Sequence, residues 1–126
     1  MPASKTRSGI ILGTPNYMSP EQIMGRQIDA RSDIFSLGVV FFQLLTGELP
    51  FREESLNNLF YQITQTTHPS PRKTNPRVLK PCEQIVNKAL AKDPDHRFQR
   101  ARVLAKYLRI LANKYRCLKS AKGKRD

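Results

Sequence analysis

The segment DIFSLGVVFFQLLTGELPF, which begins at Asp33, constrains the fold of this chain more than any other feature. Its apolar side chains point in nearly every direction around a helix, which is typical of a helix surrounded by protein. Gly47 favours a left-handed stop, and Pro50 follows shortly after it. We therefore expect a central buried helix that is capped by Ser32 and runs from Asp33 to about Thr46.

Helical signals also dominate the remaining segments. Ser19-Pro20-Glu21-Gln22 has the spacing of a capping box and predicts a short helix that ends near Gly25. Apolar residues at helical spacing predict three further helices, at about 55–65, 85–90 and 103–115. The stretch 67–81 is rich in proline and is expected to be irregular. Because we find no convincing strand, the predicted fold class is all-α, with about five helices around one central buried helix.

The length and the charge of the chain limit how many domains it can form and where they end. With 126 residues and 39% hydrophobic content, it is long enough for one domain but short for two. The formal net charge is +12, and eleven of the 22 Lys and Arg residues lie between Arg97 and Arg125. We expect a domain over 1–112 and a disordered basic tail over 113–126. Such a tail attracts phosphates or anionic lipids. We favour a solvated helix face and tail, so we do not expect nucleic acid or an anionic membrane as its partner.

The cysteines and apolar runs indicate the compartment. Cys82 and Cys117 have neither metal-ligand spacing nor the density of a disulfide framework, which favours reduced thiols, a cytoplasmic location and no metal site. MPASKTRSGIIL has three consecutive apolar residues, too few for the core of a signal peptide. The longest apolar run falls far short of the roughly 20 residues that cross a bilayer. We therefore expect a soluble protein.

Three fragments together resemble one known family. GTPNYMSPEQ, SDIFSLGVVFFQLLTGELPF and KALAKDPDHRF occur in the order and at the spacing of the C-terminal part of the large lobe of a bacterial-type serine/threonine protein kinase. They resemble, respectively, the end of the activation segment, the central buried helix, and the penultimate helix with its following loop. Ser19 stands where the family usually has Ala, and Phe35 where Trp is commoner. The resemblance covers about residues 4–112 and implies a protein-kinase-like C-lobe fragment.

The resemblance implies structural roles for three charged residues. Glu21 and Arg97 are similar to the buried ion pair that ties the activation segment to the loop before the last helix. Without the family, Glu21 would be a first-turn acid favoured by the helix dipole, and Arg97 a surface cation. Asp33 resembles the aspartate that supports the catalytic loop. Its alternative is a solvated acid in the first turn of a helix.

The resemblance also implies that the N-terminal part of this chain binds the protein substrate. Gly13, Thr14 and Pro15 resemble the loop that binds the substrate next to its phosphoacceptor. Thr6 and Ser8 stand where bacterial kinases are often autophosphorylated, and a phosphate there would add roughly 1.5 to 2 negative charges. The alternative for both hydroxyls is simple solvation. We therefore treat phosphorylation at Thr6 and Ser8 as a hypothesis.

The parts that hold the nucleotide in this family have no counterpart in this sequence. Phosphoryl transfer needs a Gly-rich loop, a strand lysine, a His-Arg-Asp catalytic loop and an Asp-Phe-Gly magnesium ligand. His96-Arg97 is followed by Phe98 rather than by Asp. We therefore expect no catalytic residue and no cofactor in this chain, with ATP and Mg²⁺ implied for the complete family domain. We do not expect the chain to be an active enzyme alone.

Two functions remain open from the sequence. One is a partial kinase domain that transfers phosphate only with the rest of the domain, so that its partners are a protein substrate and the remainder of a kinase domain. The other is a non-catalytic binding module, in which the helix 55–65 and the loop 13–17 dock on a kinase or its substrate. A central helix exposed on one side also predicts self-association.

Overall fold

The computed structural model describes residues 4–5, 11–12 and 15–123, and the regular secondary structure in these ranges is almost entirely helical. Six α-helices occur among them: α1 (Pro20–Ile23), α2 (Ala30–Thr46), α3 (Leu56–Gln65), α4 (Pro71–Thr74), α5 (Lys80–Ala89) and α6 (Ala101–Gly123). Two 3-10 turns, η1 (Pro15–Tyr17) and η2 (Pro94–His96), and an antiparallel pair of two-residue strands, β1 (Ser4–Lys5) and β2 (Ile11–Leu12), complete the order. The all-α fold class is confirmed. The short strands and α4 were not predicted.

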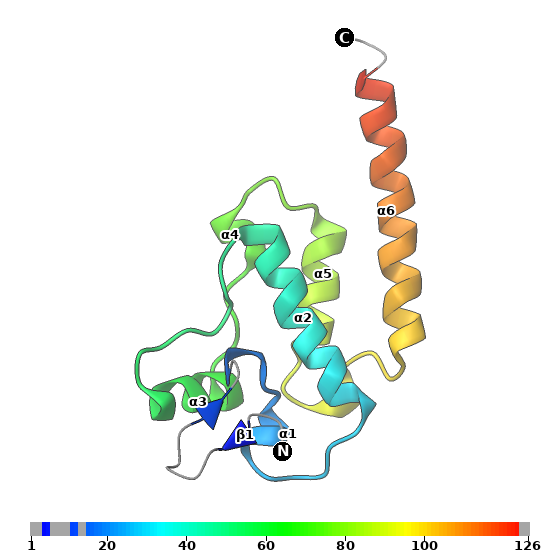
Figure 1. Ribbon diagram of the computed structural model, residues 1–126. Helices are drawn as coiled ribbons and strands as arrows, with labels where there is room; N and C mark the ends of the chain where they lie inside the picture. Colours follow the sequence, from blue (N-terminus) through cyan, green and yellow to red (C-terminus); the bar gives the residue numbers. More distant parts are fainter. Residues whose placement is uncertain (1–3, 6–10, 13–14, 124–126) are drawn as a thin grey trace.

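Helix α2 is the centre of the fold, and α5 and α6 both pack against it and against each other (Figure 1). It begins at Ala30 and not at Asp33, because Asp29 caps it. The Asp29 carboxylate accepts a hydrogen bond of 2.8 Å from the backbone N–H of Arg31. The predicted end is confirmed. Gly47 follows the last turn with φ of 77°, a left-handed conformation that favours glycine.

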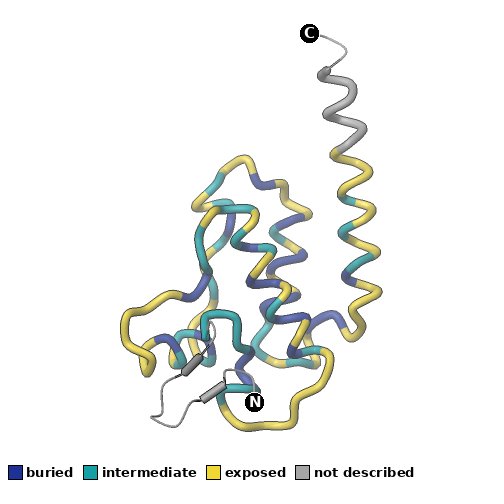
Figure 2. The backbone as a smooth tube through the Cα atoms, in the orientation of Figure 1, coloured by how far each residue is buried: buried dark blue, intermediate teal, exposed yellow. Residues whose placement is uncertain are grey.

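A glycine lets α2 and α5 approach closely. A Cβ atom on Gly38 would lie 2.8 Å from Cβ of Ala89 and 3.0 Å from Cδ2 of Leu90. Two apolar clusters form around this crossing, and buried residues follow the facing sides of α2 and α5 (Figure 2). The first cluster contains Phe35, Val39, Phe42, Phe51, Leu59, Ile63, Val86 and Leu90. The second contains Ile34, Ile85, Ala89, Phe98 and Leu104.

One side of α2 is open to solvent, so the prediction of a helix surrounded by protein is wrong for this side. Leu37, Val40 and Leu44 keep 49%, 40% and 78% of their surface exposed. The buried residues of α2 instead face α5 and the loop around Phe51. The expectation that one side of this helix is exposed agrees with these values.

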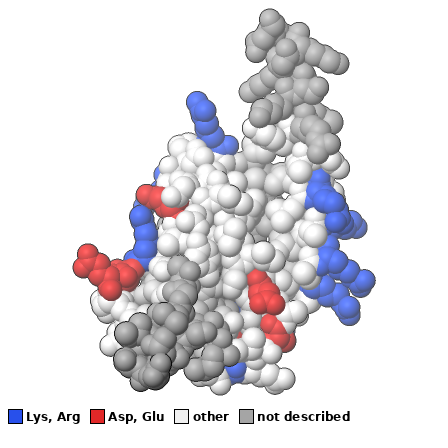
Figure 3. Space-filling view, viewed as in Figure 1, with Lys and Arg blue, Asp and Glu red and all other residues white. Residues whose placement is uncertain are grey.

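Helix α6 extends past the rest of the molecule, and Lys and Arg side chains gather along it (Figures 1 and 3). It continues beyond residue 112, where we placed the end of the domain, and reaches Gly123. The segment 113–123 is therefore helical and not the disordered tail that we expected; the domain boundary at 112 stays a prediction. None of the helices in the described ranges is long and apolar enough to cross a membrane.

Candidate functional site

A capping box fixes the short helix α1 and aims Glu21 inward. The backbone N–H of Ser19 donates to Oε1 of Gln22 at 2.8 Å, and the backbone N–H of Gln22 donates to the Ser19 hydroxyl at 3.3 Å. Pro20 occupies the first helical position, where its missing N–H costs nothing. The predicted capping box is confirmed. It leaves Glu21 only 5% exposed.

Glu21 and Arg97 form a buried ion pair across 76 positions of sequence. Nη1 of Arg97 donates to Oε2 of Glu21 at 2.6 Å, and Nη2 donates to Oε1 at 2.9 Å. This bidentate geometry is the strong form of a charge-assisted hydrogen bond. The Ser32 hydroxyl also donates to Oε2 of Glu21 at 2.6 Å. The structure thus brings together the two charges that the family motifs pair, and neither is the exposed group of the alternative interpretation.

Arg97 is 1% exposed. Besides the two bonds to Glu21, its guanidinium donates three to backbone carbonyls, of Ala91 at 2.7 Å, Arg31 at 3.0 Å and Lys92 at 3.0 Å. These five bonds equal the number of donors that a guanidinium carries. Such complete satisfaction is what offsets the cost of burying a charge. Sequence reasoning missed these acceptors because a backbone carbonyl leaves no mark in the pattern of side chains.

The surroundings of Glu21 keep its carboxyl ionised. Burial alone raises the pKa of Glu21, but the hydrogen bonds that Arg97 and Ser32 donate outweigh this effect and hold the pKa below its ordinary value. The Arg97 guanidinium also lies 5.0 Å from the ring centroid of Phe35. Phe35, where the family more often has Trp, therefore supplies an aromatic face for the buried cation.

An outer set of contacts joins the start of α2 to η2. Arg31 pairs with Asp29 at 2.9 Å and with Asp95 at 2.6 Å, and its Nη1 donates to Oε1 of Gln99 at 3.1 Å. The hydrogen bonds from Arg31 lower the pKa of Asp29. These pairs face solvent, where each is worth about 0 to 1 kcal/mol. They hold in place the backbone whose Arg31 carbonyl bonds to Arg97.

Three hydrogen bonds anchor η1 to α2 and its following loop. Nδ2 of Asn16 donates to the carbonyl of Phe51 at 3.0 Å, and the Tyr17 hydroxyl donates to Oε1 of Gln43 at 2.5 Å. The Ser36 hydroxyl donates to the carbonyl of Tyr17 at 2.6 Å. The end of the fragment that resembles an activation segment is therefore held directly on the central helix.

The remaining predicted site residues divide by where they lie. Pro15, implied in substrate binding, begins η1 and is half-buried. Asp33 is exposed in the first turn of α2, which matches the solvated-acid alternative in this chain. The implied support of a catalytic loop by Asp33 and the implied substrate contact of Pro15 stay predictions. Thr6, Ser8, Gly13 and Thr14 lie outside the described residues.

Lys92 is a half-buried cation, and the sequence does not predict its contacts. Its Nζ donates to the carbonyl of Ile63 at 2.5 Å and to that of Gln62 at 3.3 Å, and lies 4.3 Å from the ring centroid of Phe51. Burial and the charge of Arg97 lower the pKa of Lys92 to about 8. The side chain ties the loop after α5 to the last turn of α3.

The donor groups of this site do not fit a magnesium ion. Both carboxylate oxygens of Glu21 already accept hydrogen bonds from Arg97 and Ser32. Mg²⁺ requires free oxygen ligands, commonly one or two carboxylates together with water and phosphates. In the part of the chain that the structure describes, no group of three or more His, Cys, Asp or Glu side chains is placed to hold a metal ion. The hydrogen bonds of this arrangement fix segments of the chain relative to one another.

Comparison with known proteins establishes the family. The model of the protein kinase domain family matches residues 3–108. The chain is 39% identical over 120 residues to serine/threonine-protein kinase Pkn1 of Myxococcus xanthus. This match covers 89% of this chain and 17% of Pkn1. It is 43% identical over 96 residues to serine/threonine-protein kinase PrkC of Bacillus subtilis, and that match covers 76% of this chain and 15% of PrkC. It is 42% identical over 98 residues to serine/threonine-protein kinase PknB of Mycolicibacterium smegmatis, and that match covers 78% of this chain and 16% of PknB.

The chain therefore belongs to the protein kinase domain family, and the resemblance to bacterial-type serine/threonine kinases is confirmed. It spans only 15–17% of the length of these three relatives. ATP and Mg²⁺ are the cofactors that this family implies for the complete domain, and proteins are the substrates that it implies.

Proposed function

We propose that this chain supplies the substrate-side end of the activation segment and the core of the large lobe of a serine/threonine protein kinase. We further propose that it takes part in phosphoryl transfer only together with a nucleotide-binding lobe and a catalytic loop. The observation that carries the proposal is the ion pair between Glu21 and Arg97, because it joins the activation-segment motif to the late loop around one central helix. The sequence has no Gly-rich loop and no Asp-Phe-Gly motif, which supports the second part.

The contribution of this chain to the reaction would be positioning. Phosphoryl transfer depends on holding the acceptor hydroxyl in line with the transferred phosphate, and small displacements of a positioning group reduce the rate strongly. In this chain η1 is bonded to α2 through Tyr17 and Ser36, and α1 is held by the buried ion pair. Both contacts fix the segment that follows Gly13 and Thr14, the residues implied in substrate binding.

A complementation experiment tests this function. The chain is mixed with a separate polypeptide that carries the nucleotide lobe and catalytic loop of a bacterial serine/threonine kinase, and transfer of labelled phosphate from ATP to a basic protein is measured. We expect transfer by the mixture but not by either part alone. Arg97→Met should abolish it, whereas Arg109→Met, on the exposed outer side of α6, should not. Transfer by this chain alone, or no transfer when circular dichroism shows both parts folded, would reject the proposal.

Helix α3 supports a second candidate, a non-catalytic module that docks on a kinase or its substrate. Tyr61 and Leu56 are 66% and 40% exposed, and both can contact a partner protein. Leu59 is 3% exposed and belongs to the core, so it is no docking residue. Binding to a full-length kinase that is lost in Tyr61→Asp and kept in Gln65→Asp, an exposed neighbour on the same helix, would favour this candidate. Equal binding by both variants would reject it.

The cysteine pattern bears on location, and we propose that the protein works in the cytoplasm. Cys82 is a free thiol buried beside α2, and burial raises the pKa of that thiol above its ordinary value. A thiol that stays protonated and covered resists oxidation. Fractionation of cells that express a tagged protein tests the location, and recovery of the protein outside the cytoplasmic fraction would contradict it.

A further inference from the structure

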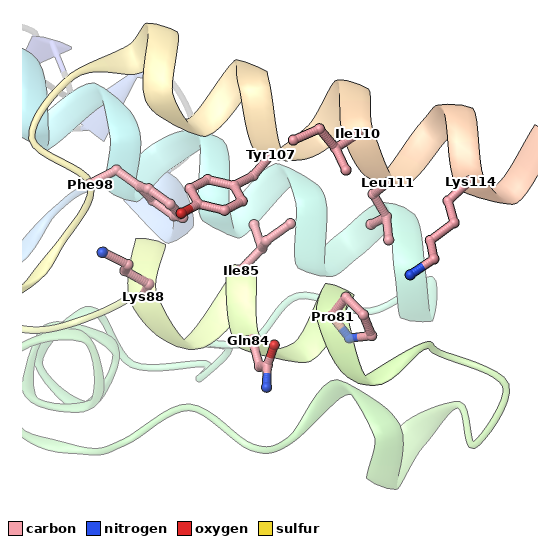
Figure 4. A pocket seen from close by; sticks show the side chains of 9 residues that line it. All are labelled: Pro81, Gln84, Ile85, Lys88, Phe98, Tyr107, Ile110, Leu111 and Lys114. Carbon is pink, nitrogen blue, oxygen red and sulfur yellow. The ribbon is translucent and has the colours of Figure 1, made fainter.

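Helices α5 and α6 form the two sides of an open apolar groove, seen from close by in Figure 4. Its inner surface is formed by Ile85 and Phe98, which are only 7% and 3% exposed. On the α6 side stand Tyr107 and Ile110, which are 51% and 53% exposed. The cavity has a volume of about 240 Å³. We call it the α5–α6 groove.

Two lysines stand at opposite ends of the α5–α6 groove, Lys88 on α5 and Lys114 on α6 (Figure 4). The ammonium group of Lys88 lies 5.1 Å from the ring centroid of Phe98, so it borders the apolar surface directly. None of the described residues that line the groove is acidic. The groove therefore combines exposed apolar surface with positive charge that no lining carboxylate neutralises.

The charge of the molecule selects among possible occupants. A second copy of this chain would bring another α6, rich in Lys and Arg, against the same lysines, and the net charge of +12 on each copy opposes that contact. The volume lies below the roughly 300–1,000 Å³ of sites that enclose a drug-sized molecule. A groove of this size between two helices suits a few apolar side chains of a peptide, as in helix-in-groove recognition.

We propose that the α5–α6 groove docks an acidic amphipathic segment of a partner protein. Its apolar side chains would pack against Tyr107 and Ile110, and carboxylates at its two ends would pair with Lys88 and Lys114. Complementary charges at the edges of an interface mainly set specificity and the rate of association. This docking needs only the folded chain, so it does not depend on the proposed role in phosphoryl transfer.

A peptide selection tests the docking site. Random short peptides displayed on phage are selected on the full chain, with the double variant Ile110→Asp, Lys114→Glu used to remove peptides that bind elsewhere. We expect the enriched peptides to combine apolar residues with Asp or Glu. No enrichment, or enrichment of basic peptides, would overturn the proposal.

Fluorescence anisotropy with a labelled enriched peptide then locates the contact. We expect Lys114→Glu and, independently, Lys88→Glu to weaken binding about tenfold, and added salt to weaken it further. The control Arg109→Glu changes the same net charge on another side of α6 and should leave affinity within about twofold. Because all three side chains are exposed, circular dichroism should show no change in folding.

Two results at this stage would contradict the proposal. The first is an equal effect of Arg109→Glu, which would indicate attraction to the general charge of α6. The second is binding to phosphatidylserine vesicles that depends on Lys88 and Lys114 and that the enriched peptide does not displace, which would assign the groove to a lipid surface.

Discussion

Replacing Arg97 with Met tests the buried ion pair quantitatively. The variant keeps much of the aliphatic volume of the side chain but removes two charge-assisted hydrogen bonds to Glu21 and three bonds to backbone carbonyls. It leaves a carboxylate that is 5% exposed without its cation. Removing one partner of a buried pair costs about 3–5 kcal/mol. Since small domains are stable by about 5–15 kcal/mol, we expect Arg97→Met to be close to unfolding.

The assay is urea denaturation followed by far-ultraviolet circular dichroism, with free energies taken from midpoints at a common slope. Arg31→Met is the matched control, because it removes exposed pairs. Each such pair is worth about 1 kcal/mol or less. Glu21→Gln should fall between the two, since the amide oxygen still accepts a hydrogen bond. A loss in Arg97→Met below about 1 kcal/mol, or one equal to that of Arg31→Met, would refute the reasoning.

The same pair predicts a dependence of stability on pH. The pKa of Glu21 is lower in the folded protein than in the unfolded chain. Its stabilisation is therefore fully present above about pH 4.3, the ordinary glutamate pKa, and is lost as the pH falls through the lower folded pKa. Glu21→Gln should lose less stability than the unmodified chain over this acid range, measured as the urea midpoint against pH. Identical slopes for the two proteins would contradict the ionised, paired state of Glu21.

Three further predictions concern packing, titration and association. A Cβ atom on Gly38 would meet Cβ of Ala89 at 2.8 Å. Gly38→Ala should therefore cost about 1–3 kcal/mol of unfolding free energy, and a urea midpoint unchanged from that of the parent chain would contradict this contact. The pKa of Lys92 is about 8 in the folded protein and higher in the unfolded chain. The unfolded chain thus binds more protons between about pH 8 and 10.4, and stability should rise with pH there. The rise should be absent in Lys92→Met, and a rise of equal size in that variant would assign it to other groups. Leu44 is 78% exposed on the open side of α2. Leu44→Glu should reduce self-association in analytical ultracentrifugation without lowering the thermal midpoint, and association equal to that of the parent chain would exclude this face of α2.

The local signals that sequence reasoning used correctly were those whose chemistry lies within a few residues. Ser19 and Gln22 form the capping box that their spacing predicts, and Gly47 adopts the left-handed conformation that its position predicts. The ion pair of Glu21 with Arg97, 76 positions away, could not be predicted from local chemistry. The order of the three family motifs predicts it.

The predictions that the structure contradicts concern segments whose sequence suits two different local conformations. Asp29 and Ser32 are both suitable caps for α2, and tertiary structure decides between them by using the Ser32 hydroxyl to bond Glu21. Pro71 belongs to the proline-rich stretch that predicts irregular chain, but proline also suits the first position of a helix, and Ser70 caps α4 there. The basic residues of 113–123 favour a disordered tail by their charge, but Lys and Arg are also good helix formers, and this segment is helical.

Equilibrium binding of labelled ATP with Mg²⁺ to the isolated, folded chain tests the central claim most directly. The account predicts no saturable binding by the chain alone, because the residues that would cradle phosphates and hold the metal are not in this sequence. The same titration should show saturable binding once the nucleotide lobe and catalytic loop are added. Saturable, Mg²⁺-dependent binding of ATP by the chain alone would contradict the account.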